Sequence, residues 1–165
     1  MSRKVIFKST NMIKLKPFRE TPGLCGPASL KMVLEYYGVL VSEARLAQIA
    51  GTTKEKGTLK EDLIRAAKHF GFQVFSKDRS TLSDLRYFIK RKIPVIVNWF
   101  LDDEGHYSVV VDIDRKKVVL MDPHLGGLRT MPIEKFLRVW FDFRGKFIRK
   151  PEDLILRLIL VITPF

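Results

Sequence analysis

The chain has 165 residues, 46% of them hydrophobic, which fits one globular domain over residues 1–165 and excludes a disordered protein. Lysine and arginine outnumber aspartate and glutamate by 30 to 18, and the resulting net charge of +12 attracts anionic partners. The single cysteine excludes an internal disulfide, and the scattered histidines offer no ligand-spaced cluster, so no metal or other cofactor is expected.

The first half of the chain is predicted to be helical. Its charged start, residues 1–8, contains no uninterrupted apolar stretch and is therefore not expected to be a signal peptide. Apolar residues then recur at helical spacing until Gly38, a residue well suited to end a helix. A capping box of Thr58 and Glu61 predicts the start of a later helix. The elements expected in this half are helices over 25–37, 42–50, 58–70 and 80–89, and a short strand over 72–75.

The second half changes to β-branched runs, which are typical of buried strands. The polar turn 114–116 separates two of these runs and predicts a β-hairpin. The apolar run at the C-terminus is too short to span a bilayer and is expected to be a strand. Strands are expected over 94–100, 107–113, 117–121 and 156–162, and a helix over 133–140. Helices first and antiparallel strands later predict an α+β fold.

Cys25 is the strongest candidate for a functional residue. It follows the turn-forming run Thr21-Pro22-Gly23 and precedes Pro27, which belongs in a first helical turn. We therefore expect Cys25 at a helix N-terminus, where unpaired N–H groups and the helix dipole stabilise a thiolate. The simpler alternative is a small buried hydrophobic residue. A base and a carboxylate elsewhere in the chain would favour the nucleophile, because Cys–His chemistry needs partners that are near in space.

His106 and Asp122 are the expected partners of Cys25. His106 begins one strand of the predicted hairpin and Asp122 ends the other, and antiparallel neighbours bring these two ends together. A carboxylate beside an imidazole fixes its tautomer and stabilises its protonated form, which in turn holds a nearby cysteine as thiolate. His124, in the turn after Asp122, is an alternative base, whereas His69 is expected on the surface near a helix end.

The order of short motifs resembles that of the bacteriocin-processing, papain-like cysteine peptidases, from about residue 16 to the C-terminus. The motifs that carry the resemblance are Cys25-Gly-Pro-Ala-Ser-Leu, Ala66-Ala67-Lys68-His69-Phe70-Gly71, Pro94-Val95-Ile96-Val97-Asn98-Trp99, Gly105-His106-Tyr107 and Met121-Asp122-Pro123. The resemblance implies a papain-like α+β fold, with N-terminal helices packed on an antiparallel sheet, and a triad of Cys25, His106 and Asp122. The best-known members are peptidase domains fused to membrane transporters, where they cut leader peptides after a double glycine. This chain contains no G-x-x-x-x-G-K-[ST] motif and is similar to the stand-alone branch.

One position departs from the pattern of this family. The family places a glutamine six residues before the cysteine, where its amide helps to form the oxyanion hole. Arg19 stands at that position here. The resemblance therefore implies an oxyanion hole made of the backbone N–H of Cys25 together with the guanidinium of Arg19. The substitution bears directly on activity, because losing one oxyanion donor costs on the order of 10²–10³ in rate.

Together these features predict a cysteine peptidase that acts through a thioester acyl-enzyme on a peptide or protein substrate. An acidic, leader-like peptide would suit the net positive charge. The alternative is a peptide-binding module that keeps the fold without turnover, and the change at Arg19 is its motivation. A third hypothesis is a basic nucleic-acid-associated protein, but the chain contains no binding motif, so no specific nucleic-acid partner is expected. We expect a cytoplasmic location and no membrane span.

Overall fold

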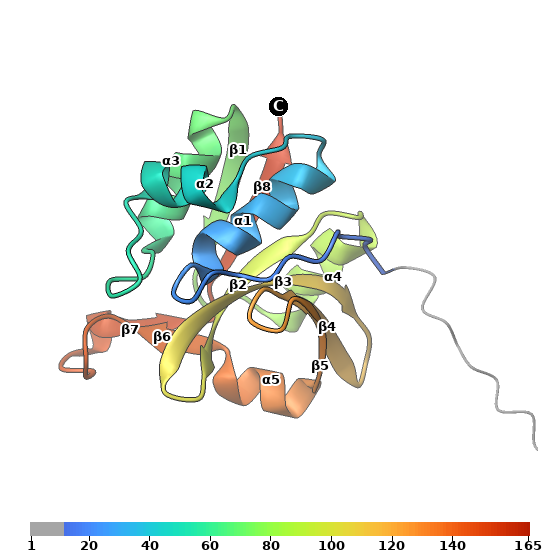
Figure 1. Cartoon of the computed structure of the whole chain (residues 1–165). Coiled ribbons are helices and arrows are strands. Elements are labelled where there is room, and N and C mark those ends of the chain that lie inside the picture. Colours follow the sequence, from blue (N-terminus) through green and yellow to red (C-terminus); the bar gives the residue numbers. More distant parts are fainter. Residues whose placement is uncertain (1–11) are drawn as a thin grey trace, which may run out of the picture.

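The structure of the protein, a computed structural model, describes residues 12–165. Residues 1–8, for which the sequence predicts no signal peptide, lie outside the described residues. The centre of the fold is a six-stranded antiparallel sheet with the strand order β1-β8-β2-β3-β4-β5 (Figure 1). Its strands are β1 (Phe72–Lys77), β2 (Val95–Leu101), β3 (Glu104–Ile113), β4 (Lys117–Asp122), β5 (Gly127–Pro132) and β8 (Ile159–Pro164).

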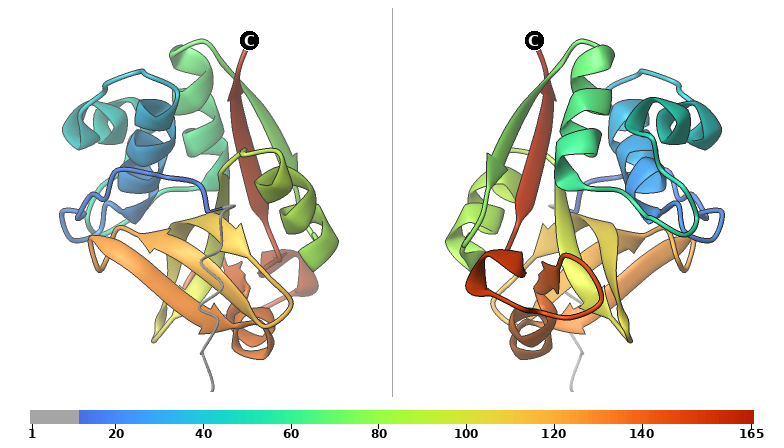
Figure 2. Two further views of the ribbon diagram at one scale, coloured as in Figure 1. Left: turned by 90° about the vertical axis from the view of Figure 1, so that its right-hand side faces the viewer. Right: turned by 90° about the vertical axis from the view of Figure 1, so that its left-hand side faces the viewer.

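Helices cover both sides of this sheet. In two views at right angles, α1, α2 and α3 gather on one side and α5 lies on the other (Figures 1 and 2). The α-helices are α1 (Cys25–Tyr36), α2 (Glu43–Ala50), α3 (Lys60–His69), α4 (Leu82–Lys90) and α5 (Ile133–Val139). A small second sheet pairs β6 (Phe141–Phe143) with β7 (Leu154–Leu156), and a short 3₁₀ helix, Pro151–Asp153, precedes β7. Helices followed by antiparallel strands confirm the predicted α+β fold class.

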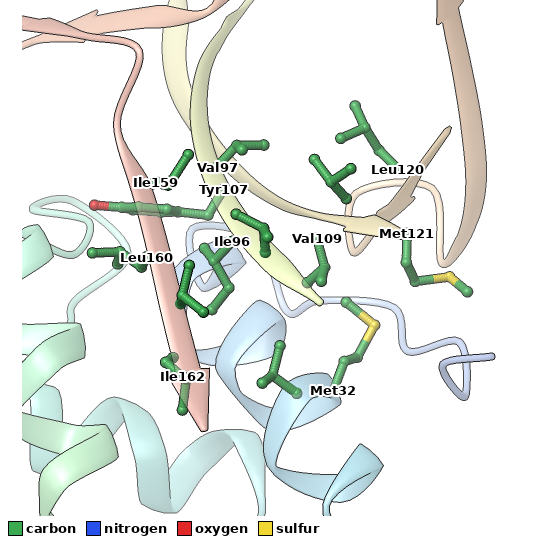
Figure 3. Packing of buried hydrophobic residues seen from close by; sticks show 14 of the residues in the cluster. Met32, Ile96, Val97, Tyr107, Val109, Leu120, Met121, Ile159, Leu160 and Ile162 are labelled. Carbon is green, nitrogen blue, oxygen red and sulfur yellow. The ribbon is translucent and has the colours of Figure 1, made fainter. Parts of the chain in front are cut away.

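The main core lies between α1 and the centre of the sheet. Met32 of α1 points toward Val109 of β3 and Met121 of β4, and all three are buried (Figure 3). On the other side of the sheet, Phe136 and Trp140 are fully buried. Each fully buried large apolar side chain contributes about 1.5–3 kcal/mol relative to an exposed one. β3 and β4 are therefore held between two apolar layers, which makes them a rigid base for polar side chains at their ends.

The predicted helices of the first half are confirmed, with ends within two residues of the expected ones. The predicted capping box at Thr58 is wrong, because α3 has Leu59 at its N-cap and no side-chain cap. The Thr58 hydroxyl lies 2.6 Å from the hydroxyl of Thr52, and Glu61 accepts from Arg144 at 2.6 Å. Both side chains therefore have other partners, and tertiary contacts replace the local cap.

The strands of the second half differ from the prediction in three places, one of which is β6, where no strand was expected. The expected strand 156–162 is split into β7 and β8, because Arg157 between them has a positive φ of 50°. β5 was not predicted. It is an edge strand on which only Met131 is buried, so its apolar alternation is weak, and it follows the glycine pair Gly126-Gly127, which is typical of a turn.

Candidate active site

Cys25 is the first residue of α1, as the turn and the following proline predicted. The turn before it is closed by a 2.9 Å hydrogen bond from the Leu24 N–H to the Thr21 carbonyl. Gly23 in this turn has a φ of +87°, and a Cβ there would lie 2.8 Å from the Cα of Lys54. No side chain caps α1, so its first N–H groups are free to bind an anion. The Cys25 thiol is free and partly exposed.

The register of the sheet brings His106 and Asp122 together on one face. Val109 of β3 pairs with Met121 of β4, so Ser108 lies opposite Asp122 and His106 lies diagonally across from it. His106 Nε2 is 2.6 Å from Asp122 Oδ1. The two side chains are only 6% and 0% exposed. The structure thus brings together the two strand ends that the hairpin was expected to join.

Burial and the charges of neighbouring groups have opposite effects on the pKa of His106. Burial alone would lower its pKa, but hydrogen bonds to Asp122 and Cys25, and the negative charges of both partners, raise the pKa of His106 to about 9. Because Nε2 faces Asp122, Nδ1 is the ring nitrogen that is left for the thiol of Cys25. His106 therefore links the thiol to the carboxylate, and its imidazolium form is favoured at neutral pH.

Asp122 is a buried carboxylate with four hydrogen-bond partners. Besides His106, Oδ1 accepts from the Ser108 hydroxyl at 3.4 Å and from the His124 backbone N–H at 3.0 Å. Oδ2 accepts from Arg129 Nε at 2.6 Å. Burial would raise the pKa of Asp122. The hydrogen bond and the positive charge of His106, followed by the hydrogen bond from Arg129, lower the pKa of Asp122 to about 2. Asp122 is therefore ionised across the physiological pH range.

Two further side chains on this face were not predicted, Trp99 and Arg129. Trp99 pairs with His106 across β2 and β3, and its ring meets the imidazole edge to face, with centroids 5.4 Å apart. Trp99 Nε1–H donates to the Ser108 hydroxyl at 3.0 Å. The guanidinium carbon of Arg129 lies 5.5 Å from the centre of the Trp99 ring. Trp99 lies on β2, where the sequence predicted a strand, whereas Arg129 lies on β5, where no strand was expected.

The two alternative histidines do not share the environment of His106. The rings of His124 and His106 are 5.9 Å apart, but the His124 side chain is 60% exposed and its Nδ1 lies 3.5 Å from Glu20 Oε1. His124 reaches Asp122 only through its backbone N–H. His69 ends α3 and packs against Phe70. The geometry favours His106 as the base over both alternatives.

The segment before Cys25 turns Glu20, rather than Arg19, toward the imidazoles. Arg19 is exposed and forms no hydrogen bond or ion pair with any other residue of 12–165, so its role as an oxyanion donor stays a prediction. The Glu20 side chain is only 9% exposed, and the Glu20 backbone N–H donates to the Pro123 carbonyl at 2.9 Å. Burial raises the pKa of Glu20, while the charges of His106 and His124 oppose this rise. Spacing along the chain did not distinguish which of the two neighbours turns inward.

Within the part of the chain that the structure describes, no group of three or more His, Cys, Asp or Glu residues is arranged to bind a metal ion. Nor does any helix between residues 12 and 165 combine the length and apolar character needed to cross a membrane. The groups that converge on this site are a thiol, imidazoles, carboxylates and a guanidinium.

Comparisons of the sequence with known proteins give one consistent result. A family model described as Peptidase C39 family matches residues 21–144. An uncharacterised protein of Methanothermobacter thermautotrophicus is 40% identical over 129 residues, which cover 78% of this chain and 84% of that protein. The pediocin PA-1 transport/processing ATP-binding protein PedD of Pediococcus acidilactici is 34% identical over 123 residues. These residues are 70% of this chain but only 16% of PedD.

Solved structures agree with the sequence comparisons. The peptidase domain of Streptococcus ComA, a bi-functional ABC transporter involved in a quorum sensing pathway, matches with a TM-score of 0.69 and 27% identity, over 93% of this chain and 99% of the domain. A double glycine motif protease from an AMS/PCAT transporter, solved in complex with the leader peptide, matches with a TM-score of 0.71 and 21% identity. That match covers 95% of this chain and 96% of the protease, and at this identity it shows the fold. The predicted peptidase fold is confirmed.

Proposed function

The chain belongs to the Peptidase C39 family, and we propose that it is a cysteine peptidase whose catalytic triad is Cys25, His106 and Asp122. The observation that carries this proposal is the buried 2.6 Å contact between His106 and Asp122, with Cys25 at the free N-terminus of α1. A thiol, a base that it contacts and a carboxylate that orients the base are the parts that nucleophilic acyl transfer needs.

In the first half of the reaction, Cys25 Sγ attacks the carbonyl carbon of the scissile peptide bond. A C–S bond forms, and the carbonyl π electrons move onto the oxygen, which becomes an oxyanion. The backbone N–H of Cys25 donates to this oxyanion, helped by the positive end of the α1 dipole. As the intermediate collapses, the C–N bond breaks and His106 gives its Nδ1 proton to the leaving amine. A thioester on Cys25 remains.

In the second half, water attacks the thioester carbonyl while His106 Nδ1 takes one of its protons. The C–S bond breaks, the carboxylic acid leaves and Cys25 departs as a thiolate beside the imidazolium. Asp122 keeps Nε2 of His106 bonded throughout, so Nδ1 faces the thiol in both halves. Trp99 packs against the ring and restricts its rotation.

For the substrate class, we propose a leader-like peptide. The support comes from relatives, since PedD is named for transport and processing and the AMS/PCAT protease was solved with a leader peptide. The net charge of +12 supports an acidic peptide at long range. In the segment before Cys25, however, Glu20 faces the imidazoles and the buried Glu43 accepts from the Thr21 N–H, so we expect acidic residues of the peptide to bind away from the scissile bond.

The direct test is hydrolysis of a synthetic acidic peptide that contains a double glycine, followed by mass spectrometry. We expect cleavage by the wild type, a mass increase for the acyl-enzyme at early times, and neither product nor adduct with Cys25→Ala. A matched control is Ser29→Ala, a buried small residue on the same helix. Peptide that stays intact over a range of double-glycine sequences, with an unreactive thiol, would contradict the proposal.

The second candidate is a peptide-binding module without turnover. The observation that favours it lies before Cys25, where the inward side chain is the carboxylate of Glu20 and Arg19 is exposed. An ionised carboxylate near a developing oxyanion opposes catalysis. Replacing Arg19 with Gln tests this candidate. A large gain in hydrolysis would indicate an impaired oxyanion hole, whereas tight peptide binding without turnover in either form would indicate a binding module.

A further inference from the structure

We propose that Arg129 is a positioning residue, which fixes the rotation of the Asp122 carboxylate so that one oxygen faces His106. This inference rests on the proposed function, in which Asp122 orients the catalytic imidazole. Arg129 acts through Asp122, because the hydrogen bond that it donates in this site is the 2.6 Å bond from its Nε to Asp122 Oδ2.

The register of the sheet places Arg129 beside Asp122. Arg129 of β5 pairs with Leu120 of β4, and Leu120 shares one face of β4 with Asp122, two residues along. Arg129 therefore lies diagonally across from Asp122, as His106 does from the opposite neighbour, β3. Asp122 is flanked on one face of the sheet by a base on one strand and a guanidinium on the other.

The two oxygens of Asp122 have different partners. Oδ1 accepts from His106, from the Ser108 hydroxyl and from the His124 N–H, whereas among residues 12–165 Oδ2 accepts from Arg129 alone. A carboxylate bonded through one oxygen can turn about its Cβ–Cγ bond, but a charge-assisted bond at the second oxygen fixes its plane. Arg129 therefore sets the direction in which Oδ1 points.

Arg129 is itself restrained. Its side chain is only 24% exposed, and its guanidinium lies over the Trp99 ring, with 5.5 Å between its carbon and the ring centre. The same ring meets His106 edge to face at 5.4 Å. Trp99 thus packs against two of the three side chains that bond the carboxylate, His106 and Arg129, and donates a hydrogen bond to the third, Ser108, which limits the freedom of the whole group.

A permanent cation at Oδ2 matters because His106 changes charge during the reaction. The charged and titratable groups around Asp122 are His106 from β3, Arg129 from β5, His124 from the following turn and Glu20 from the N-terminal segment. When His106 has given its proton to the leaving amine, it no longer supplies a positive charge. The positive charge of Arg129 is still beside the buried carboxylate at that moment and favours its ionised form.

The test compares Arg129→Met with Arg129→Lys in two assays across about pH 3 to about pH 10, alkylation of Cys25 by iodoacetamide and hydrolysis of the double-glycine peptide. Alkylation reports on Cys25 alone, because the chain has no other cysteine. Both rates are expected to fall on acidification, and we call this part of each profile the acid limb. For Arg129→Met we expect the acid limb to move toward neutral pH by about one unit. The maximal rate of hydrolysis, the plateau, should fall about tenfold. For Arg129→Lys we expect the limb to stay and the plateau to recover in part, since the charge remains but the planar guanidinium is lost.

Two controls separate positioning from stability. Arg65→Met removes a guanidinium with an equally short 2.6 Å bond to a carboxylate, Asp62, on the surface of α3, and both profiles should match the wild type. In an Asp122→Asn background, Arg129→Met should produce no further shift, because its effect passes through Asp122. If Arg129→Met does not fold, as judged by circular dichroism, Arg129→Lys and the Asp122→Asn background still decide.

The proposal is overturned if Arg129→Met lowers rates by one factor at every pH and leaves the limb in place, because a purely structural role predicts that result. A further shift in the Asp122→Asn background would also overturn it. A wild type that alkylates rapidly at acid pH but cleaves no peptide would count against the proposed peptidase activity. The alkylation profiles of the variants would then still report on Arg129.

Discussion

The polar groups on the two sides of Cys25 differ in how fully they are hydrogen-bonded. On the sheet side, His106 contacts a carboxylate that is fully buried and bonded to four groups, which come from two strands, β3 and β5, and from a turn. On the N-terminal side, Arg19 is exposed, and Glu20, the buried neighbour, is a carboxylate whose pKa is raised by burial. The comparison indicates that the sheet side holds His106 and Asp122 in one arrangement, as the proposed proton transfer requires, whereas the residues before Cys25 depart from the family pattern.

The largest expected effect on activity is that of replacing Asp122, on the sheet side of Cys25. Asp122→Asn should lower kcat by about 10⁴-fold, the size expected when a triad carboxylate becomes an amide and the imidazole loses its orientation. The measurement is steady-state hydrolysis of the double-glycine peptide at neutral pH. The control is Asp112→Asn, another buried carboxylate on β3, which accepts from the Ile113 N–H and should leave kcat near the wild-type value. Equal losses in both variants would contradict a special role for Asp122.

A second change on the sheet side of Cys25 disturbs the backbone next to His106. Gly105→Ala places a methyl group against the partly buried carboxylate of Asp142, so either the Asp142 side chain or the start of β3 must shift. We expect a loss of about 1–3 kcal/mol in the free energy of unfolding, measured by urea denaturation, together with reduced activity. Gly127→Ala is the matched control, because no atom of residues 12–165 lies within 4 Å of its added methyl group. A stable and fully active Gly105→Ala would show that this close approach does not position His106.

The N-terminal side should respond in the opposite direction. Glu20→Gln replaces a carboxylate with an amide that can donate a hydrogen bond, and we expect kcat/KM at pH 8 to rise by up to about tenfold. The pKa of Glu20 is raised, so the gain should shrink as the pH falls and Glu20 becomes neutral. Arg19→Ala, at the exposed neighbour, should change kcat/KM little. A large loss in Arg19→Ala would instead assign the oxyanion to the guanidinium.

The smallest expected effect is on the pH dependence of stability. The pKa of His106 is raised to about 9 from the ordinary 6.5, so its contribution is complete below pH 6.5 and is lost as the pH rises through about 9. The pKa of Asp122 is lowered from 3.8 to about 2, so its contribution is complete above pH 3.8 and is lost as the pH falls through about 2. His106→Gln should flatten the alkaline decline in urea-unfolding experiments, and His69→Gln should not. An unchanged decline would show that the pair does not couple folding to protonation.

Much of the site was predictable because its parts depend on short-range signals. The turn before Cys25 and the proline after it placed the thiol at a helix N-terminus. The polar turn between β3 and β4 joined two β-branched runs into a hairpin, and antiparallel pairing alone then brought His106 to Asp122. Arg129 was not predicted as a site residue, because it lies on an edge strand with one buried side chain, where apolar and polar residues hardly alternate.

The sequence by itself determined the α+β class, the helix that carries Cys25, and the hairpin that carries His106 and Asp122, because helical periodicity, turn residues and strand pairing act over a few residues. Only the tertiary structure decided which groups surround these three. Tertiary packing turns the Glu20 side chain inward and leaves Arg19 exposed. It also places the Thr58 hydroxyl against Thr52, rather than at the predicted helix cap. Such choices depend on which surfaces meet when distant segments fold together, and this contact between segments leaves no local pattern along the chain.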